Sequence, residues 1–374
     1  MIEAEQDHWE PKINTGEDER VVTPSSNPSG GEALTFIDLF AGIGGFHLAM
    51  HSHGAKCVFA SEWDKFARQT YEANFRALEP ELFAQGRFAG DINAVNLDDI
   101  PPFDILCAGF PCQPFSNAGL KKGFEDTRGT LFFRIAQIIK DKCEKGYPPK
   151  VIFLENVKGL MHHDKGRTLD TICSVLDELG YRVAYKTLNA RNFGVPQNRE
   201  RIFIVSWRKE SPVSRFYFPL GISVNREPIF NSEDLKHYVL KTRVGDILLP
   251  EVEGKYTLSE QLYAGHVRRK KKHEQMGNGF GFSMFNAESP YTNTISARYY
   301  KDGSEILIEQ KGERPRKLHP TEAAKLQGFP IGKGFRIVVS DTQAYKQFGN
   351  SVAIPMVDSI ALQIIKQLLN RSNE

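Results

Sequence analysis

The chain has 374 residues, 40% of them hydrophobic and 25% charged, an ordinary composition for a soluble globular protein with one large domain or two. Its formal net charge is only +2, so any surface for nucleic acid must come from the local placement of charge. Five cysteines without a Cys-x-x-Cys pair argue against a structural zinc site and a disulfide framework and fit a reducing cytoplasm, and we expect neither a signal peptide nor a membrane span.

The N-terminal part of the chain predicts a leader followed by the first unit of a ligand-binding sheet. Residues 1–33 are polar and rich in Glu, Pro, Ser and Gly, so we expect a disordered leader. Residues 35–40 predict a strand, residues 41–45 a glycine turn, and residues 46–51 the opening of a helix. Glycines let a ligand approach the backbone, but His47 stands where the dinucleotide fingerprint has its third glycine. This pattern disfavours a pyrophosphate cofactor and leaves a cofactor without phosphates possible.

Three side chains after the next strands suit an adenosine-containing ligand. The predicted strand 56–61 ends at Glu62, about twenty residues after the glycine turn, where an acidic residue can accept ribose hydroxyls. Trp63 can stack on an adenine ring, although a core aromatic at a helix start is an equally good interpretation. Asp91, at the end of an expected third strand, can accept a hydrogen bond from an exocyclic amine.

Two reactive side chains follow the next predicted strands. Residues 103–108 form an apolar run that predicts a buried strand, and Cys112 comes on the loop just beyond it, between two prolines. Residues 150–154 predict another buried strand, which ends at Glu155. In open α/β sheets ligands bind at the carboxyl ends of strands, so Cys112 is a candidate nucleophile beside Glu155. A lone cysteine is more often a buried structural thiol, and only the surrounding motifs favour the nucleophile.

The remaining pattern predicts a doubly wound α/β fold with a second module. Helices to about Lys142 and over residues 168–179 alternate with strands over 181–189 and 202–207, as in a mostly parallel sheet. Residues 34–207 are therefore expected to form a Rossmann-like catalytic domain. The alternation stops in residues 208–313, for which we expect a smaller, irregular and β-rich module. Residues 314–374 predict a hinge, a short helix at 320–327 and a long C-terminal helix from Gly349 that returns to the first domain.

The second module carries a basic run, Arg268 to Lys272. A charge run is usually a solvated face. Basic residues beside aromatic and hydroxyl side chains, as in the segment from Thr292 to Tyr300, also suit a nucleic-acid backbone and its bases.

Taken together, these motifs resemble the DNA (cytosine-5)-methyltransferases of bacterial type II restriction-modification systems and their solitary relatives. The resemblance covers nearly everything from Thr35 to Leu369. Six blocks occur in the family's order: 36–45, Gly109-Phe-Pro-Cys-Gln113, Glu155-Asn-Val157, Gln197-Asn-Arg-Glu-Arg-Ile202, Arg316 through Pro330, and Gly349-Asn-Ser-Val352. One departure is small, since many relatives have threonine where His319 stands.

The resemblance implies the cofactor and the site residues. The cofactor is S-adenosylmethionine, without a metal, and its expected contacts are Phe40, Ala41, Gly42, Ile43, Gly44, Glu62, Trp63, Asp91, Ile92, Asn350 and Val352. Cys112 is expected to add to cytosine C6 and Glu155 to protonate or hydrogen-bond N3, with Arg199 and Arg201 as candidates to supply an electropositive setting, hold substrate phosphate or orient Glu155. The expected substrate contacts are Gln113, Ser116, Asn117 and Arg298.

The resemblance also implies a partner and a biological setting. Residues 208–313 correspond to the family's target-recognition domain, so double-stranded DNA is the expected substrate, with the target base flipped out. The segment Ser296 to Gly303 resembles that of enzymes that methylate the inner cytosine of CCNGG-like or CCGG sites. We expect a cytoplasmic, nucleoid-associated monomer that protects DNA from a cognate restriction endonuclease without forming a stable complex with it.

Two other functions compete with this interpretation. The first is an RNA methyltransferase of the same fold that acts on tRNA. Such relatives lack a large recognition insert, whereas this chain has one of about a hundred residues, which suits the wide major groove of duplex DNA better. The second is a DNA-binding regulator without catalytic activity. Such a protein is expected to have lost catalytic residues, yet Cys112, Glu155, Arg199 and Arg201 are all present.

Overall fold

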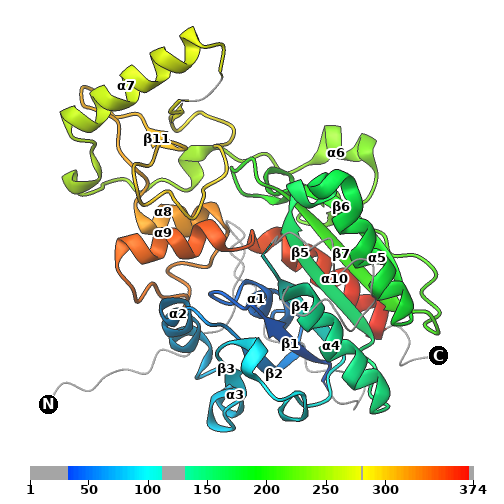
Figure 1. Cartoon of the computed structure of the whole chain (residues 1–374). Coiled ribbons are helices and arrows are strands. Elements are labelled where there is room, and N and C mark those ends of the chain that lie inside the picture. Colours follow the sequence, from blue (N-terminus) through cyan, green and yellow to red (C-terminus); the bar gives the residue numbers. More distant parts are fainter. Residues whose placement is uncertain (1–32, 112–130, 279–280, 370–374) are drawn as a thin grey trace, which may run out of the picture. The chain divides into compact units, whose positions relative to one another are not determined.

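A computed structural model describes residues 33–111, 131–278 and 281–369 (Figure 1). The predicted leader up to residue 32 and the candidates Cys112, Gln113, Ser116 and Asn117 lie outside the described residues. The described chain divides into two compact units. We call residues up to 188, 200–219 and from 357 onward the sheet unit, and residues 189–199 and 220–356 the insert unit.

The sheet unit is built on a seven-stranded sheet with the order β3-β2-β1-β4-β5-β7-β6. Strands β1 to β5 run parallel to their neighbours, and β7 pairs with β5 in the antiparallel direction. The fold class predicted from sequence, a mostly parallel α/β sheet, is confirmed. The strands are β1 (Thr35–Leu39), β2 (Lys56–Ser61), β3 (Phe88–Ala89), β4 (Ile105–Gly109), β5 (Val151–Val157), β6 (Tyr181–Asn189) and β7 (Glu200–Arg208).

Some strand ends differ from the sequence prediction. The apolar run of β5 stops at Leu154, but pairing with β7 continues to Val157, which lies opposite Arg201. Glu155 therefore lies near the carboxyl end of the strand, as predicted, and the partner strand continues the ladder for two residues beyond it. Strand β3 already ends at Ala89, and Asp91 begins a 3₁₀ helix, Ile92–Ala94, by accepting a hydrogen bond from the Asn93 N–H.

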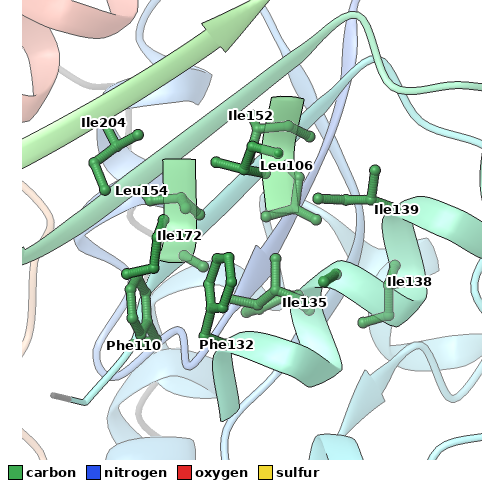
Figure 2. Packing of buried hydrophobic residues seen from close by; sticks show 14 of the residues in the cluster. Leu106, Phe110, Phe132, Ile135, Ile138, Ile139, Ile152, Leu154, Ile172 and Ile204 are labelled. Atoms are coloured by element: carbon green, nitrogen blue, oxygen red, sulfur yellow. The ribbon is translucent and has the colours of Figure 1, made fainter. Parts of the chain in front are cut away.

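Helices cover both faces of the sheet, as a doubly wound fold requires. On one face, α4 (Leu131–Glu144) and α5 (Arg167–Glu178) pack isoleucine and phenylalanine side chains against Leu106, Ile152 and Leu154 (Figure 2). On the other face lies α1 (Gly45–His51), where the Phe46 ring meets the Phe153 ring edge-on at 4.9 Å. Alternate residues of β5 thus serve opposite faces, and all of these side chains are buried.

The sheet unit has further helices around its N-terminal half. They are α2 (Lys65–Phe75), α3 (Pro80–Ala84) and the 3₁₀ helices Leu97–Asp99, Lys158–Met161 and His163–Gly166. Helix α2 begins where the Asp64 carboxylate accepts the N–H groups of Phe66 and Ala67, which satisfies donors that a helix start leaves free.

The insert unit is irregular, as predicted, but it is not rich in strand. The four strands among its described residues have two residues each, whereas α7 is sixteen residues long. The polar α7 buries only His266, so the sequence shows no apolar stripe that would have predicted a helix. The elements are β8 (Gly221–Ile222), β9 (Pro228–Ile229), α6 (Ser232–Tyr238), α7 (Glu260–Gln275), β10 (Met284–Phe285), β11 (Leu307–Ile308) and the 3₁₀ helices Ala190–Phe193, Val244–Asp246 and Gly254–Tyr256.

Up to residue 369, where the described chain ends, the C-terminal segment contains three helices, whereas the sequence predicted two. They are α8 (Pro320–Leu326), α9 (Asp341–Asn350) and α10 (Ile354–Leu369). The predicted start of the long helix at Gly349 is thus wrong. Gly349 lies in the last turn of α9, and a short non-helical segment separates α9 from α10. Pro355 lacks a backbone N–H and is tolerated only in the first turn of a helix, which places the start of α10.

Within the sheet unit, the later part of α10 contacts the end of α1. The Asp358 carboxylate accepts a hydrogen bond from the Ser52 hydroxyl at 2.7 Å and lies 2.9 Å from His53 Nε2. By length and composition, no single helix among the described residues could cross a membrane; only α9 and α10 taken together, across a bend, pass that test.

Replacing Gly44 with alanine should destabilise the sheet unit more than the same change at Gly42. Both glycines have positive φ, 86° and 57°, which costs other residues about 1–2 kcal/mol. A Cβ on Gly44 would overlap the buried Phe75 ring, which is stacked on His47, whereas one on Gly42 would meet nothing within 4 Å. Overpacking adds about 1–3 kcal/mol at Gly44 alone. Circular dichroism should show the lower melting temperature for Gly44→Ala, and equal values for the two variants would contradict the packing argument.

Candidate active site

The carboxyl edge of the sheet holds a buried ion pair between Glu155 and Arg201. Glu155 Oε1 lies 3.0 Å from Arg201 Nε, and the two side chains are only 11% and 14% exposed. The β5–β7 register sets Glu155 opposite Phe203 and Val157 opposite Arg201. Glu155 and Arg201 are therefore diagonal neighbours on one face of the sheet, within reach of long side chains. Burial lowers the pKa of the Arg201 guanidinium, and the Glu155 carboxylate opposes that shift.

The chain that leads to Cys112 passes beside this ion pair. Gly109, the last residue of β4, is paired with Glu155, and a Cβ on Gly109 would lie 3.7 Å from Glu155 Oε2. The Asn156 side-chain amide donates a hydrogen bond to the Phe110 carbonyl at 2.8 Å, and its oxygen accepts the Val157 N–H. The chain just before Cys112 is thus held at a fixed point next to Glu155.

Asn156 is a positioning residue that the strand pattern alone would not reveal. It is 3% exposed and joins β5 to the chain just after β4. Its only sequence signal is its place after Glu155 in one of the family-like blocks.

The structure gives Arg199 different partners from Arg201. Arg199 belongs to the insert unit and is only 1% exposed. Its guanidinium donates to the carbonyls of Ile295 and Gly349, each at 3.2 Å, and to the Ser351 carbonyl. These contacts hold three backbone segments of the insert unit together. A catalytic role for Arg199 stays a prediction.

The glycine turn after β1 has the tight backbone expected of a ligand-binding loop. Phe40 and Gly42 both adopt positive φ, 56° and 57°. The turn is closed by a hydrogen bond from the Gly44 N–H to the Ala41 carbonyl at 2.8 Å, and Ala41 N–H donates to the Ser61 carbonyl at 2.9 Å. Ala41, Ile43 and Gly44 are buried in this turn, whereas Phe40 and Gly42 are half-buried at the carboxyl end of β1.

Glu62 connects this turn to the end of β2. Its Oε2 accepts the Gly42 N–H and its Oε1 accepts the Asp64 N–H, both at 2.8 Å. Burial raises the pKa of the Glu62 carboxyl, and these two backbone donors oppose the shift. Each carboxylate oxygen can accept a further hydrogen bond, so Glu62 still has acceptor capacity for ribose hydroxyls.

The other expected cofactor residues in the sheet unit surround the ends of β2 and β3. The Trp63 side chain is 82% exposed, so its ring is available for stacking. Asp91 is exposed and already accepts two hydrogen bonds from Asn93, while Ile92 is buried. This set of residues offers two carboxylate acceptors and an open aromatic ring, which suit the hydroxyls, the amine and the ring of an adenosine. The residues therefore fit an adenosine group such as that of S-adenosylmethionine.

Arg68 is a positioning residue that the sequence interpretation missed. It lies on α2, and its guanidinium donates to the carbonyls of Glu62, at 3.0 Å, and Phe88, at 3.1 Å, and to that of Ala89. These bonds hold the ends of β2 and β3 together beneath Glu62 and Asp91. A helical arginine has no motif of its own, and only the folded chain shows what it binds.

Three further candidates lie in the insert unit. Asn350 is exposed at the end of α9, and Val352 is 7% exposed in the link to α10. Arg298 is exposed in a turn where its N–H donates to Ser296 Oγ. Their roles toward cofactor and substrate stay predictions.

One group of described residues has the composition of a metal site. His47, His51 and Glu79 each offer a ligand atom, all within 4.8 Å of one another. Two of them already have partners in the core, because His47 Nδ1 lies 2.6 Å from the Tyr71 hydroxyl and Glu79 accepts the Cys57 N–H. His47 fills the third-glycine position with a buried ring, which agrees with a loop not built for pyrophosphate.

The amino-acid sequence matches a known protein family and several individual proteins. The profile of a family described as C-5 cytosine-specific DNA methylase matches residues 34–366. The type II methyltransferase M.SsoII of Shigella sonnei is 55% identical over 336 residues, which is 89% of this chain and 80% of that protein. M1.ScrFI of Lactococcus lactis subsp. cremoris is 53% identical over 89% of this chain and 78% of its own length.

The fold also matches a solved structure. The Dnmt2 methyltransferase of S. pombe superposes with a TM-score of 0.66 over 91% of this chain and 100% of its own. Its sequence identity is 19%, so this likeness concerns the fold alone.

The Glu155–Arg201 pair should contribute to stability as a buried pair. Glu155→Ala leaves the buried guanidinium without its carboxylate, which should lower the free energy of unfolding by about 3–5 kcal/mol. Glu200→Ala is the matched control, because Glu200 pairs with Lys158 at 2.9 Å on the surface, where such pairs contribute about 0–1 kcal/mol. Urea denaturation followed by circular dichroism measures both losses. Similar losses of unfolding free energy in the two variants would contradict the prediction that the Glu155–Arg201 pair contributes more to stability than a surface ion pair.

Proposed function

Since the chain belongs to the C-5 cytosine-specific DNA methylases and is a DNA-cytosine methyltransferase, we propose a specific reaction for it. The enzyme transfers a methyl group from S-adenosylmethionine to C5 of a flipped-out cytosine in a short duplex sequence, through a covalent bond between Cys112 and cytosine C6. The observation that carries this proposal is the buried Glu155–Arg201 pair beside Gly109, three residues before Cys112.

The chemistry requires a nucleophile and a group that stabilises charge on the ring. The Cys112 thiolate adds to C6, and the electrons of the C5–C6 double bond move toward N3 and make C5 nucleophilic. A free thiol is only a few per cent ionised at neutral pH. Bound S-adenosylmethionine supplies the methyl group. Removal of the C5 proton then restores the double bond and expels Cys112.

Glu155 is proposed to act on cytosine N3. Its Oε1 is bound by Arg201, and its Oε2 lies on the side of Gly109, toward the chain that leads to Cys112. A carboxyl group held in this way can give N3 a proton or a hydrogen bond as electron density moves there. Such general acid help is worth roughly 10² to 10⁴-fold in rate.

The backbone of the glycine turn, Glu62, Trp63 and Asp91 are proposed to hold the cofactor. Glu62 accepts the ribose hydroxyls, Trp63 covers one face of the adenine and Asp91 accepts the adenine amine. Ile92, Asn350 and Val352 complete the set through the family resemblance. The exposed Trp63 ring and the available acceptors on Glu62 support this assignment.

The substrate is double-stranded DNA, in which the target cytosine is inaccessible within the stack. Flipping it out costs a few kcal/mol. The proposed target is a CCNGG-like or CCGG site, read by the segment around the exposed Arg298, with Gln113, Ser116 and Asn117 near the base. The enzyme acts as a monomer on nucleoid DNA in a bacterial cytoplasm, and its methylation protects DNA from a cognate restriction endonuclease.

Expression in bacteria without DNA methylation should mark one short motif. Base-resolution methylation sequencing should find 5-methylcytosine in that motif for the native chain and none for Cys112→Ser, because serine is too weak a nucleophile for the C6 addition. Methylation that survives in Cys112→Ser would remove Cys112 as the nucleophile. Unmodified DNA together with methyl transfer to tRNA would support the RNA methyltransferase instead.

Glu62→Gln should weaken binding of S-adenosylmethionine. Hydrogen bonds to a charged group contribute about 1.5–3 kcal/mol, so we expect the dissociation constant to rise about 10- to 150-fold. Isothermal titration calorimetry measures it. Glu72→Gln on α2 is the control, since Glu72 is an exposed partner of Arg76 and should bind like the native chain. An unchanged constant in Glu62→Gln would exclude the ribose contact.

A further inference from the structure

The basic run of α7 divides into two groups of side chains. All five residues from Arg268 to Lys272 are exposed. Because successive residues of a helix are about 100° apart, Arg268, Lys271 and Lys272 fall within an arc of about 100°, and Arg269 and Lys270 lie outside it. We call the first three residues the basic face of α7.

The side chains of Arg269 and Lys270 contact other residues of the insert unit. The Arg269 guanidinium lies 3.2 Å from Asp302 Oδ2 and 3.0 Å from His266 Nδ1. The buried His266 ring also contacts the Asp302 carbonyl through Nε2 at 3.2 Å. Lys270 places its ammonium 5.0 Å from the centre of the Phe282 ring. These contacts fasten α7 to the rest of the unit.

The basic face itself has no partner among the described residues of the protein. The side chains of Arg268, Lys271 and Lys272 form no ion pair or hydrogen bond there, and the nearby Glu274 falls on the side of Lys270. One turn earlier, the same side of α7 carries Gly265, where an added Cβ would meet nothing within 4 Å. Three unneutralised cations beside a bare stretch of backbone suit close approach of a polyanion.

The same contacts join α7 to the segment expected to read bases. Asp302, which binds Arg269, lies in the segment from Ser296 to Gly303 that also contains the exposed Arg298. That segment is folded tightly, since Lys301 N–H donates to the Arg298 carbonyl at 2.9 Å. The basic face and Arg298 therefore belong to one connected part of the insert unit.

We propose that the basic face of α7 binds backbone phosphates of the target duplex next to the bases read around Arg298. This proposal rests on the proposed function, and it assigns phosphate binding and base reading to different residues. Arg268, Lys271 and Lys272 provide affinity that does not depend on sequence, because phosphates are the same at every base pair. Arg269 does not bind DNA, but positions the helix relative to the base-reading segment.

The test uses the full-length protein with Arg268→Gln, Lys271→Gln and Lys272→Gln combined. Fluorescence anisotropy over a salt series gives the affinity for a duplex with the methylated motif and for a scrambled duplex. Each phosphate contact contributes about 0.9 to the slope of log affinity against log salt, so the slope should decrease by about 2–3. Affinity for both duplexes should fall by the same factor, roughly 10²-fold at physiological salt. KM for DNA should rise while kcat stays unchanged.

A matched variant removes the same net charge from the sheet unit, with Lys140→Gln, Lys186→Gln and Lys366→Gln combined. It should keep the native slope and affinity, and both variants should melt at the native temperature. If the α7 variant keeps the native slope while the native enzyme methylates DNA, the basic face is only solvated and this proposal fails alone. If the native chain neither binds nor methylates duplex DNA, both proposals fail. A loss confined to the methylated motif would assign the basic face to base reading and also overturn the proposal.

Discussion

The candidate site depends on the antiparallel pairing of β5 and β7. In a purely parallel sheet, neighbouring strands present their carboxyl ends at the same edge. Here the start of β7 meets the end of β5, so Arg201 and Glu155 become diagonal neighbours on one face. A slip of one residue in this pairing would turn Arg201 to the other face and leave two charges unpaired. The apolar side chains of β7, buried on both faces, hold that register.

Arg199 and Arg201 are only two residues apart, but each is bound within a different unit. Gln197 is fully buried, donates to the Leu326 carbonyl and accepts the Ile295 N–H. Together with Arg199 it binds backbone of the insert unit, while Arg201, two residues later, pairs with Glu155 in the sheet unit. Buried polar side chains of this kind are stable because nearly all of their donors find acceptors. Two arginines in one motif can therefore have unrelated physical roles.

The parts of the fold that sequence predicted well are those in which burial produces a pattern. Strands β1, β2 and β4 and helices α1 and α5 agree with the prediction to within a few residues. The strands and α5 bury apolar side chains in one core, and α1 buries its own on the other face of the sheet. The missed features lack that signal. Helix α7 is mostly polar, and the break between α9 and α10 falls within a stretch whose apolar residues continue across it.

The sequence by itself determined the chemistry of this protein: the fold class, the family and the residue types that adenosine binding and cytosine methylation require. These follow from local order along the chain, such as a glycine turn after a strand or an acid after a strand. Tertiary structure alone decided which of these residues meet. It paired Arg201 rather than Arg199 with Glu155, and it fixed the Phe110 backbone, two residues before Cys112, through Asn156. It also divided the basic run of α7 into side chains that bind other residues of the insert unit and side chains without such partners. The physical reason is that partners and burial are set by strand register and by packing between segments distant in sequence.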